Sequence, residues 1–175
     1  MRNNLSFLQK IFGQAKQRAP LEPLYRAIVA EGRDPAWYHA GVPDTLDGRF
    51  DMIAAVMALA LLRIEAEGEA GRAPSVLLTE LFIDDMDGTL RQIGIGDHVV
   101  GKHVGKMMGA LGGRLAAFRA AREEGGAFID AVRRNIFHES APSEQAVETV
   151  AARLEMLAGA LDTLAVETLL EGRLR

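Results

Sequence analysis

An acidic string at residues 84–88, Asp-Asp-Met-Asp-Gly, has residue types and a spacing that could perform chemistry. Closely spaced carboxylates can hold a divalent cation or exchange protons with a substrate. In a calcium-binding EF-hand loop with its glycine at Gly88, an acid would stand at the position of Ile83 and a glutamate at the position of Gly94. Neither acid is present. The string therefore does not predict a calcium loop.

The same string, Asp85-Met-Asp87-Gly-Thr, resembles the first motif of phosphatases of the haloacid-dehalogenase type. The resemblance implies that Asp85 attacks phosphorus, that Asp87 is the general acid/base and that Mg²⁺ neutralises the developing charge. These phosphatases place the motif after a buried parallel strand and need a later acidic pair for the metal. Beyond Gly88 the only adjacent pair of acids is Glu123-Glu124, and no segment there has the sequence pattern of a strand. A phosphatase remains the alternative function, and the sequence predicts a protein that is not an enzyme.

The spacing around the acidic string is helical. Apolar residues at positions 78, 82, 86, 90 and 93 form one stripe, which predicts a helix over 74–93. Asp85 lies beside this stripe, and a carboxylate there should face a cation, for which Arg49 and Lys102 are candidates. The other charged residues fall three or four apart on the solvent side and can pair weakly there: Glu80, Asp84, Asp87 and Arg91.

The following helix carries Gly101, Gly105, Gly109 and Gly113 at four-residue intervals. Each interior glycine costs about 1 kcal/mol relative to alanine, so a row of them indicates a reason. One interpretation is close approach by a neighbouring helix of the same bundle. The other is a shallow cationic groove with a methionine-rich wall that receives an apolar helix from outside. We call such an outside helix the client of this groove. The candidate client-binding residues are His98, Lys102, Lys106, Gly101, Gly105, Gly109, Met107 and Met108.

Composition excludes several classes of function. The 175 residues carry a net charge of −4 and no cysteine, and they include only four scattered histidines. No basic field favours nucleic acid. The lack of cysteine excludes disulfides, thiolate nucleophiles, cysteine-ligated zinc, iron–sulfur clusters and covalent haem. We therefore expect no metal and no cofactor.

The whole chain predicts an all-α fold, a single compact bundle of about six to seven helices over residues 20–175. Apolar residues dominate 50–67, which places this helix at the centre of the bundle. The last helix has an apolar stripe, from Val147 to Leu164, that should pack on its own domain, with a homodimer as the alternative. The expected helices are 21–31, 35–38, 50–67, 74–93, 97–122, 127–137 and 144–170.

Residues 1–19 predict a basic amphipathic helix or extension without a secretory cleavage site. Such a helix either docks on its own domain or rests on an anionic membrane or ribosomal surface. The candidate membrane contacts are Arg2, Phe7, Lys10 and Phe12. The longest apolar run, 52–62, is shorter than the roughly 18 residues that a membrane span requires.

Three strings together resemble the ubiquinol–cytochrome c chaperone family. They are the segment 37–52, WYHAGVPDTLDGRFDM; the segment 81–87, LFIDDMD; and the segment 91–97, RQIGIGD, with Val100-Gly-Lys102 and Gly113-Arg114 after it. Their order and spacing carry the resemblance, which covers residues 24–122. The family-motif positions are Tyr38, Gly41, Pro43, Asp44, Asp47, Arg49, Asp51, Asp85, Asp87, Gly94, Gly96 and Asp97.

The resemblance implies a non-catalytic helical domain that holds newly made cytochrome b during assembly of the respiratory bc1 complex. It also implies a small partner protein and a place near the ribosome exit. We accordingly expect a cytoplasmic protein, peripheral on the inner face of the inner membrane.

Overall fold

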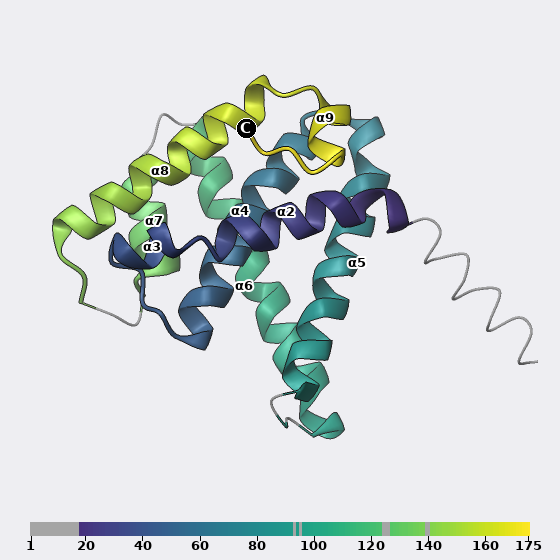
Figure 1. Cartoon of the computed structure of the whole chain (residues 1–175), viewed down its shortest axis with the longest axis horizontal. Coiled ribbons are helices and arrows are strands. Elements are labelled where there is room, and N and C mark those ends of the chain that lie inside the picture. Colours follow the sequence, from purple (N-terminus) through teal and green to yellow (C-terminus); the bar gives the residue numbers. More distant parts are fainter. Residues whose placement is uncertain (1–17, 93, 95, 124–126, 139–140) are drawn as a thin grey trace, which may run out of the picture.

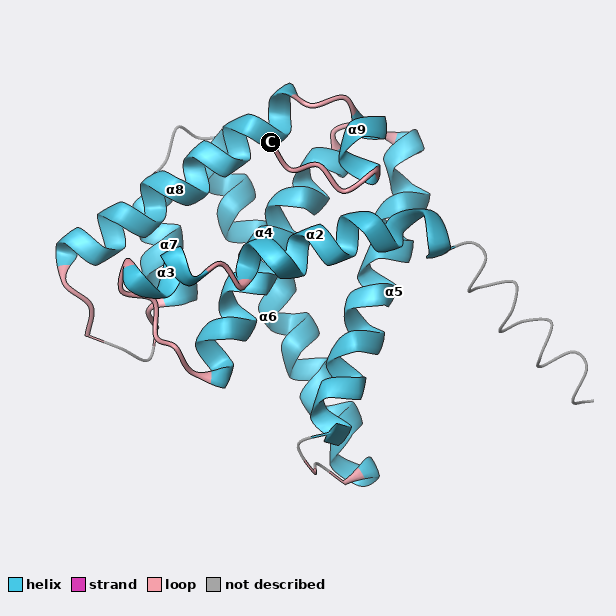
Figure 2. Ribbon diagram, in the orientation of Figure 1, coloured by secondary structure: helices cyan, strands magenta, loops and turns pink. Residues whose placement is uncertain are grey.

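The computed structural model describes residues 18–92, 94, 96–123, 127–138 and 141–175, and all secondary structure in these ranges is helical (Figure 2). The expected all-α bundle is confirmed. The expected extension at residues 1–17, with Arg2, Phe7, Lys10 and Phe12, lies outside the described residues. The helices, in chain order, are η1 (Ala19–Leu21), α2 (Glu22–Gly32), α3 (Pro35–His39), α4 (Leu46–Glu65), α5 (Glu69–Gln92), α6 (Asp97–Glu123), α7 (Phe128–Ile136), α8 (Glu144–Thr163) and α9 (Val166–Leu170) (Figure 1).

Helix α4 is the central element of the bundle. It contacts α2, α5, α6, α7 and α8, and every residue from Met52 to Ala60 is at most 2% exposed. The Thr45 hydroxyl caps its start by accepting a hydrogen bond from the Gly48 amide at 3.0 Å. The nearly continuous apolar sequence therefore lies at the centre, as predicted.

Helix α5 begins at Glu69, so the predicted loop before Pro74 is wrong. A short turn at 66–68 joins α4 to α5, and Gly71 lies so close to the Ile64 carbonyl that a Cβ there would collide with it. This close approach lets α5 start five residues before Pro74. Pro74 lies inside α5 as its sixth residue, where its missing N–H removes one backbone hydrogen bond of the helix.

Two other predicted boundaries differ. Helix α4 begins at Leu46 rather than residue 50, because Thr45 provides the cap. The predicted helix 144–170 is two helices, since Leu164 adopts an extended backbone (ψ 140°) between α8 and α9.

The apolar stripe of α8 packs on its own domain, as expected. Val147, Val150, Leu154, Leu157 and Leu161 are each at most 2% exposed. The α8 stripe is therefore buried against other helices of the same chain.

Trp37 links the short helix α3 to α8. The Asp34 carboxylate accepts a hydrogen bond from the Ala36 amide at 2.9 Å and caps α3. The Trp37 indole donates to the Glu31 carbonyl at 2.8 Å, and the Arg153 guanidinium lies 4.3 Å from its ring centroid.

Candidate functional site

A cleft of about 900 Å³ lies where α3 and the start of α4 meet the end of α5 and the first half of α6. Its floor is apolar and is made by Phe50, Ile53, Met86, Leu90 and Met107. Its rim is polar and carries Arg33, His39, Asp44, Asp47, Arg49 and His103. An apolar floor with charged groups at the edge is the form of a surface that takes an apolar ligand and orients it.

The α3–α4 turn positions one side of the cleft. Gly41 has a positive φ of 113°, and a Cβ at Gly48 would collide with the Pro43 carbonyl. The Tyr38 hydroxyl donates to the Gly32 carbonyl at 2.9 Å and holds α3 against the end of α2. The motif glycines, proline and tyrosine therefore shape the turn that presents the rim.

Arg49 pairs with Asp44 across this turn. Its Nε donates to Asp44 Oδ1 at 2.7 Å, and the guanidinium holds the pKa of the Asp44 carboxyl below its ordinary value. The prediction that Arg49 faces Asp85 is therefore wrong. Asp44 is only five residues from Arg49 along the chain, so the arginine pairs with this local carboxylate and not with Asp85.

Asp85 instead accepts a hydrogen bond from the Tyr25 hydroxyl of α2 at 2.7 Å. Burial, reinforced by this hydrogen bond, raises the pKa of Tyr25. The expected cation at Asp85 is thus replaced by a neutral donor, and neither Arg49 nor Lys102 pairs with this carboxylate among the described residues. Spacing along one helix could not identify a partner from a helix sixty residues earlier.

The acidic string lies within helix α5, as its spacing predicted. Asp87 accepts from Arg91 Nε at 2.7 Å one turn later. The Glu80 and Asp84 carboxylates bind the guanidinium of Arg18, with Arg18 Nε 2.9 Å from Glu80 Oε2. A helical backbone does not give this string the strand-end setting of the phosphatase motif, and two of its carboxylates are occupied by arginines.

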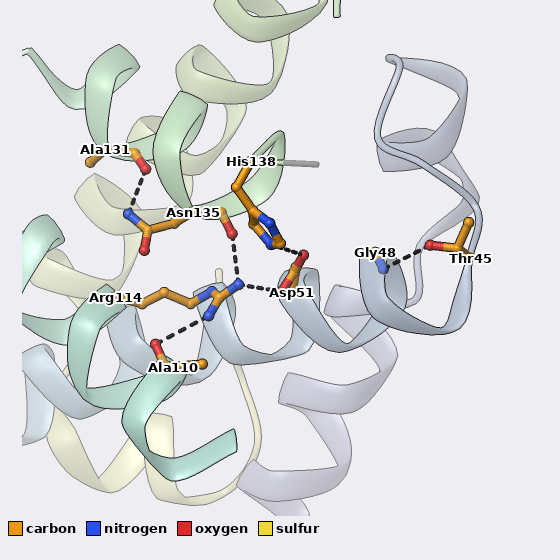
Figure 3. Close-up of polar contacts among 8 residues, drawn as sticks. All are labelled: Thr45, Gly48, Asp51, Ala110, Arg114, Ala131, Asn135 and His138. Carbon is orange, nitrogen blue, oxygen red and sulfur yellow. Dashed lines mark hydrogen bonds and ion pairs between the residues drawn. The ribbon is translucent and has the colours of Figure 1, made fainter. Parts of the chain in front are cut away.

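Asp51 and Arg114 form a buried ion pair that joins α4 to α6 (Figure 3). Arg114 also donates to the Asn135 carbonyl at 2.6 Å and to the Ala110 carbonyl at 3.1 Å. His138 Nε2 lies 3.0 Å from the second Asp51 oxygen. Because both groups lose water, burial raises the pKa of Asp51 and lowers that of Arg114, while the charges of Arg114 and His138 oppose the rise at Asp51.

This network touches the cleft. The Arg114 guanidinium lies 5.7 Å from the ring centroid of Phe50, which is part of the floor. Asp51 and Arg114 belong to the sequence strings singled out above, but Asn135 and His138 were missed. Nothing in the spacing of a surface-like histidine after α7 indicates a buried aspartate 87 residues earlier.

The glycine row of α6 is not packed against a neighbouring helix. A Cβ at Gly101, Gly105, Gly109 or Gly113 would meet no atom of the described residues within 4 Å. The interpretation of close approach within the bundle is therefore wrong, and this face of α6 is open in the described structure.

The other client-binding candidates are distributed around α6. Met107 lines the cleft, whereas Met108 is half-buried against the core. Lys102 and Lys106 are exposed and have no ion pair with another described residue. The backbones of Asp97 and His98 begin α6, but their side chains lie outside what is described. Gly94 and Gly96 form the α5–α6 turn.

Within the described ranges, no helix combines the length and the hydropathy needed to cross a membrane.

Comparisons with known proteins agree with these observations. The model of a family described as ubiquinol-cytochrome C chaperone matches residues 38–175, which include most of the cleft and all of the buried network. Among solved structures, the chain is similar to a Cbp3 homolog from Brucella abortus. The two are 30% identical, the match covers 95% of this chain and 93% of that chain, and the TM-score is 0.76. No curated protein matches the chain.

Proposed function

Since this chain belongs to the ubiquinol-cytochrome C chaperone family, we propose that it binds newly made cytochrome b during assembly of the bc1 complex. The proposed role is non-catalytic. The client would be an apolar membrane protein that must be kept from aggregating before it is inserted. The chain therefore needs an accessible surface that is apolar but bounded by polar groups.

The cleft is the observation that carries this proposal. One side of it comes from segment 37–52 of the family resemblance, a second side comes from α5 and includes Met86 of segment 81–87, and a third side comes from α6 through His103 and Met107. Leu46 at its edge is 58% exposed and adds an accessible aliphatic side chain to the apolar floor. Methionines at 86 and 107 give the floor side chains that adapt to differently shaped apolar partners.

The α6 edge extends this surface in the proposal. Lys102 and Lys106 stand exposed beside the open glycine row, next to the helix face that supplies Met107. Their positive charge would favour polar or acidic groups that flank an apolar client segment. We retain the client-binding residues predicted from sequence, and add His103 and Leu46.

Leu46→Glu tests the cleft. Leu46 is the first residue of α4, where an acid is favourable for the helix, so the fold should be kept. A charge at the edge of the cleft must be desolvated when an apolar segment binds, and we expect about tenfold less cytochrome b to co-purify. Met156→Glu, at a 75% exposed methionine on α8, is the matched control and should leave recovery unchanged. Equal recovery with both variants would contradict the cleft assignment.

Charge reversal tests the α6 edge. Lys102→Glu with Lys106→Glu should keep the circular-dichroism spectrum and weaken cytochrome b capture. Arg26→Glu with Arg134→Glu makes the same change of net charge on exposed parts of α2 and α7 and should have no effect on capture. If the lysine variant captures as much cytochrome b as the arginine variant, the lysines are not part of the client surface.

We also propose that the chain works with a small partner protein, near the ribosome exit and peripheral to the inner face of the inner membrane. The basic residues of segment 1–17, including Arg2 and Lys10, support a contact with anionic surfaces. The full chain should co-sediment with vesicles of anionic lipid at low salt, and a chain that begins at residue 18 should not. Co-sedimentation of both, or of neither, would contradict this role of the segment.

A further inference from the structure

The first half of α6 forms one wall of the cleft but has a sequence that makes a weak helix. His103 and Met107 face the cleft, while Gly101, Gly105 and Gly109 occupy the open side of the same turns. Each glycine lowers the stability of a helix interior relative to alanine. An alanine Cβ would fit at all three positions, so packing within the described structure does not require glycine there.

This half of α6 reaches the main core only at its end, where Met107 and Met108 pack against the core cluster. Leu90 of α5 and Val100 of α6 are buried, at 4% and 2% exposure, but neither belongs to the contiguous core cluster. Leu111 and Phe118, farther along α6, do belong to it. In Figure 1 the joined ends of α5 and α6 project beyond the other helices. A projecting segment with a small apolar contact opens at a lower free energy than the rest of a domain.

A fixed point follows directly after the weak half. Arg114 is 3% exposed and is held by Asp51 and by the Asn135 carbonyl (Figure 3). Its guanidinium also lies over the ring of Phe50.

Arg114 also donates to the Ala110 carbonyl at 3.1 Å, and Leu111 is 3% exposed in the core, so the fixed part of α6 begins at Ala110. Gly109 stands directly before this fixed part, and a Cβ there would meet no described atom within 4 Å. A glycine inside a helix lowers its stability relative to alanine, so the chain places a weak point beside a rigid anchor.

We propose that residues 99–108 of α6 are a gate for the cleft, which opens about Gly109 while Ala110, Leu111 and Arg114 remain fixed. Opening moves His103 and Met107 away and widens access to the floor at Phe50 and Met86. That the gate admits a client rests on the proposed function, whereas the motion itself belongs to the free protein and can be measured without any client.

Amide hydrogen exchange of the free full-length chain tests the motion. We expect residues 99–108 to exchange at least tenfold faster than residues 114–122 of the same helix. Gly105→Ala with Gly109→Ala should slow exchange in 99–108 by about tenfold, because both alanines favour the helix. Gly159→Ala, an exposed glycine of α8 with the same open surroundings, is the matched control and should leave 99–108 unchanged.

Thiol labelling gives a second measurement, because the chain has no cysteine of its own. Val100→Cys and Val147→Cys introduce similar thiols at positions that are 2% and 0% exposed. The gate predicts that the thiol at position 100 reacts at least tenfold faster than the thiol at 147, and that the double alanine variant slows only the former.

Equal exchange along α6, or equal labelling at the two positions, would overturn the gate. Those outcomes are independent of client capture. If instead the gate is observed and the Leu46→Glu variant still captures cytochrome b normally, the proposed client surface is wrong and the motion stands.

Discussion

At the scale of single residues, the Asp51–Arg114 pair is the polar interaction that most constrains the bundle. Each buried charge has lost most of its hydration, so the pair is stable only because several acceptors surround the guanidinium and His138 lies beside the carboxylate. Removing one partner leaves the other buried and uncompensated. This arrangement joins α4 and α6 to α7 and to the turn at His138 that follows α7 (Figure 3).

Arg114→Met should cost about 3–5 kcal/mol of folding stability at pH 7, because Asp51 remains buried without its cation. In this variant burial acts unopposed by the arginine, and the pKa of Asp51 rises further above the ordinary 3.8. A raised folded-state pKa contributes stability below 3.8 that is lost as pH rises through the raised value. The deficit relative to the unmodified chain should therefore be smaller at pH 4 than at pH 7.

Urea denaturation at the two pH values measures this difference. Arg119→Met is the matched control, since Arg119 lies on the same helix and its pair with Glu65 is exposed. We expect it to cost less than about 1 kcal/mol. An Arg114→Met deficit that does not change with pH would contradict the role assigned to Asp51.

Tyr25→Phe should cost about 1–3 kcal/mol, because Asp85 would lose the hydroxyl that it faces between α2 and α5. A double-mutant cycle with Asp85→Ala, followed by urea denaturation, measures the coupling. If the two changes are additive, the hydrogen bond contributes nothing to stability. The same variants should leave the far-ultraviolet circular-dichroism spectrum helical.

At the scale of elements, the helical period predicted the fold class and most helices, because burial of an apolar stripe depends on local spacing. It did not predict the start of α5. There the relevant contact is between Gly71 and the carbonyl of Ile64 on the preceding helix, which has no signature in periodicity.

The candidate site was predicted only in part, for the same reason. The motif segments could be identified from their residues, but the cleft exists because α3, α5 and α6 meet, and the partners of Asp51 and Asp85 come from other helices. The glycine row was identified correctly as unusual. Whether it was packed or open depended on the positions of the neighbouring helices.

Two glycines of α5 should respond oppositely to alanine. Gly71→Ala should destabilise the protein by about 1–3 kcal/mol, because the added methyl group meets the Ile64 carbonyl. Gly88→Ala, with open space around it in the same helix, should stabilise the protein by about 1 kcal/mol. Thermal or urea unfolding of the two variants checks the signs, and a loss of similar size in both would contradict the contact between α4 and α5.

At the scale of the whole molecule, the end of the chain closes the bundle over its beginning. Leu169 and Leu174 are buried, and Arg175 lies 2.7 Å from Glu31 of α2. Around α4, the long helices pack their apolar residues into one core cluster. In the proposed function, the cleft and the adjacent edge of α6 are the surface for an apolar partner.

The chain should be a monomer of about 18.9 kDa in light scattering after size exclusion, because the α8 stripe that could have formed a dimer is buried. The mass should not change between micromolar and tens of micromolar protein. A mass of twice this value would show that another face, outside the α8 stripe, mediates dimerisation.

Trp37 gives this molecule a built-in optical reporter. It is the single tryptophan of the chain, and its ring lies between the Glu31 carbonyl and the Arg153 guanidinium, so all indole fluorescence originates at the junction of α3 with α8. Emission at short wavelength would show that this corner is intact. A shift to longer wavelength in any variant would reveal that the corner has separated, even where the total helix content is unchanged.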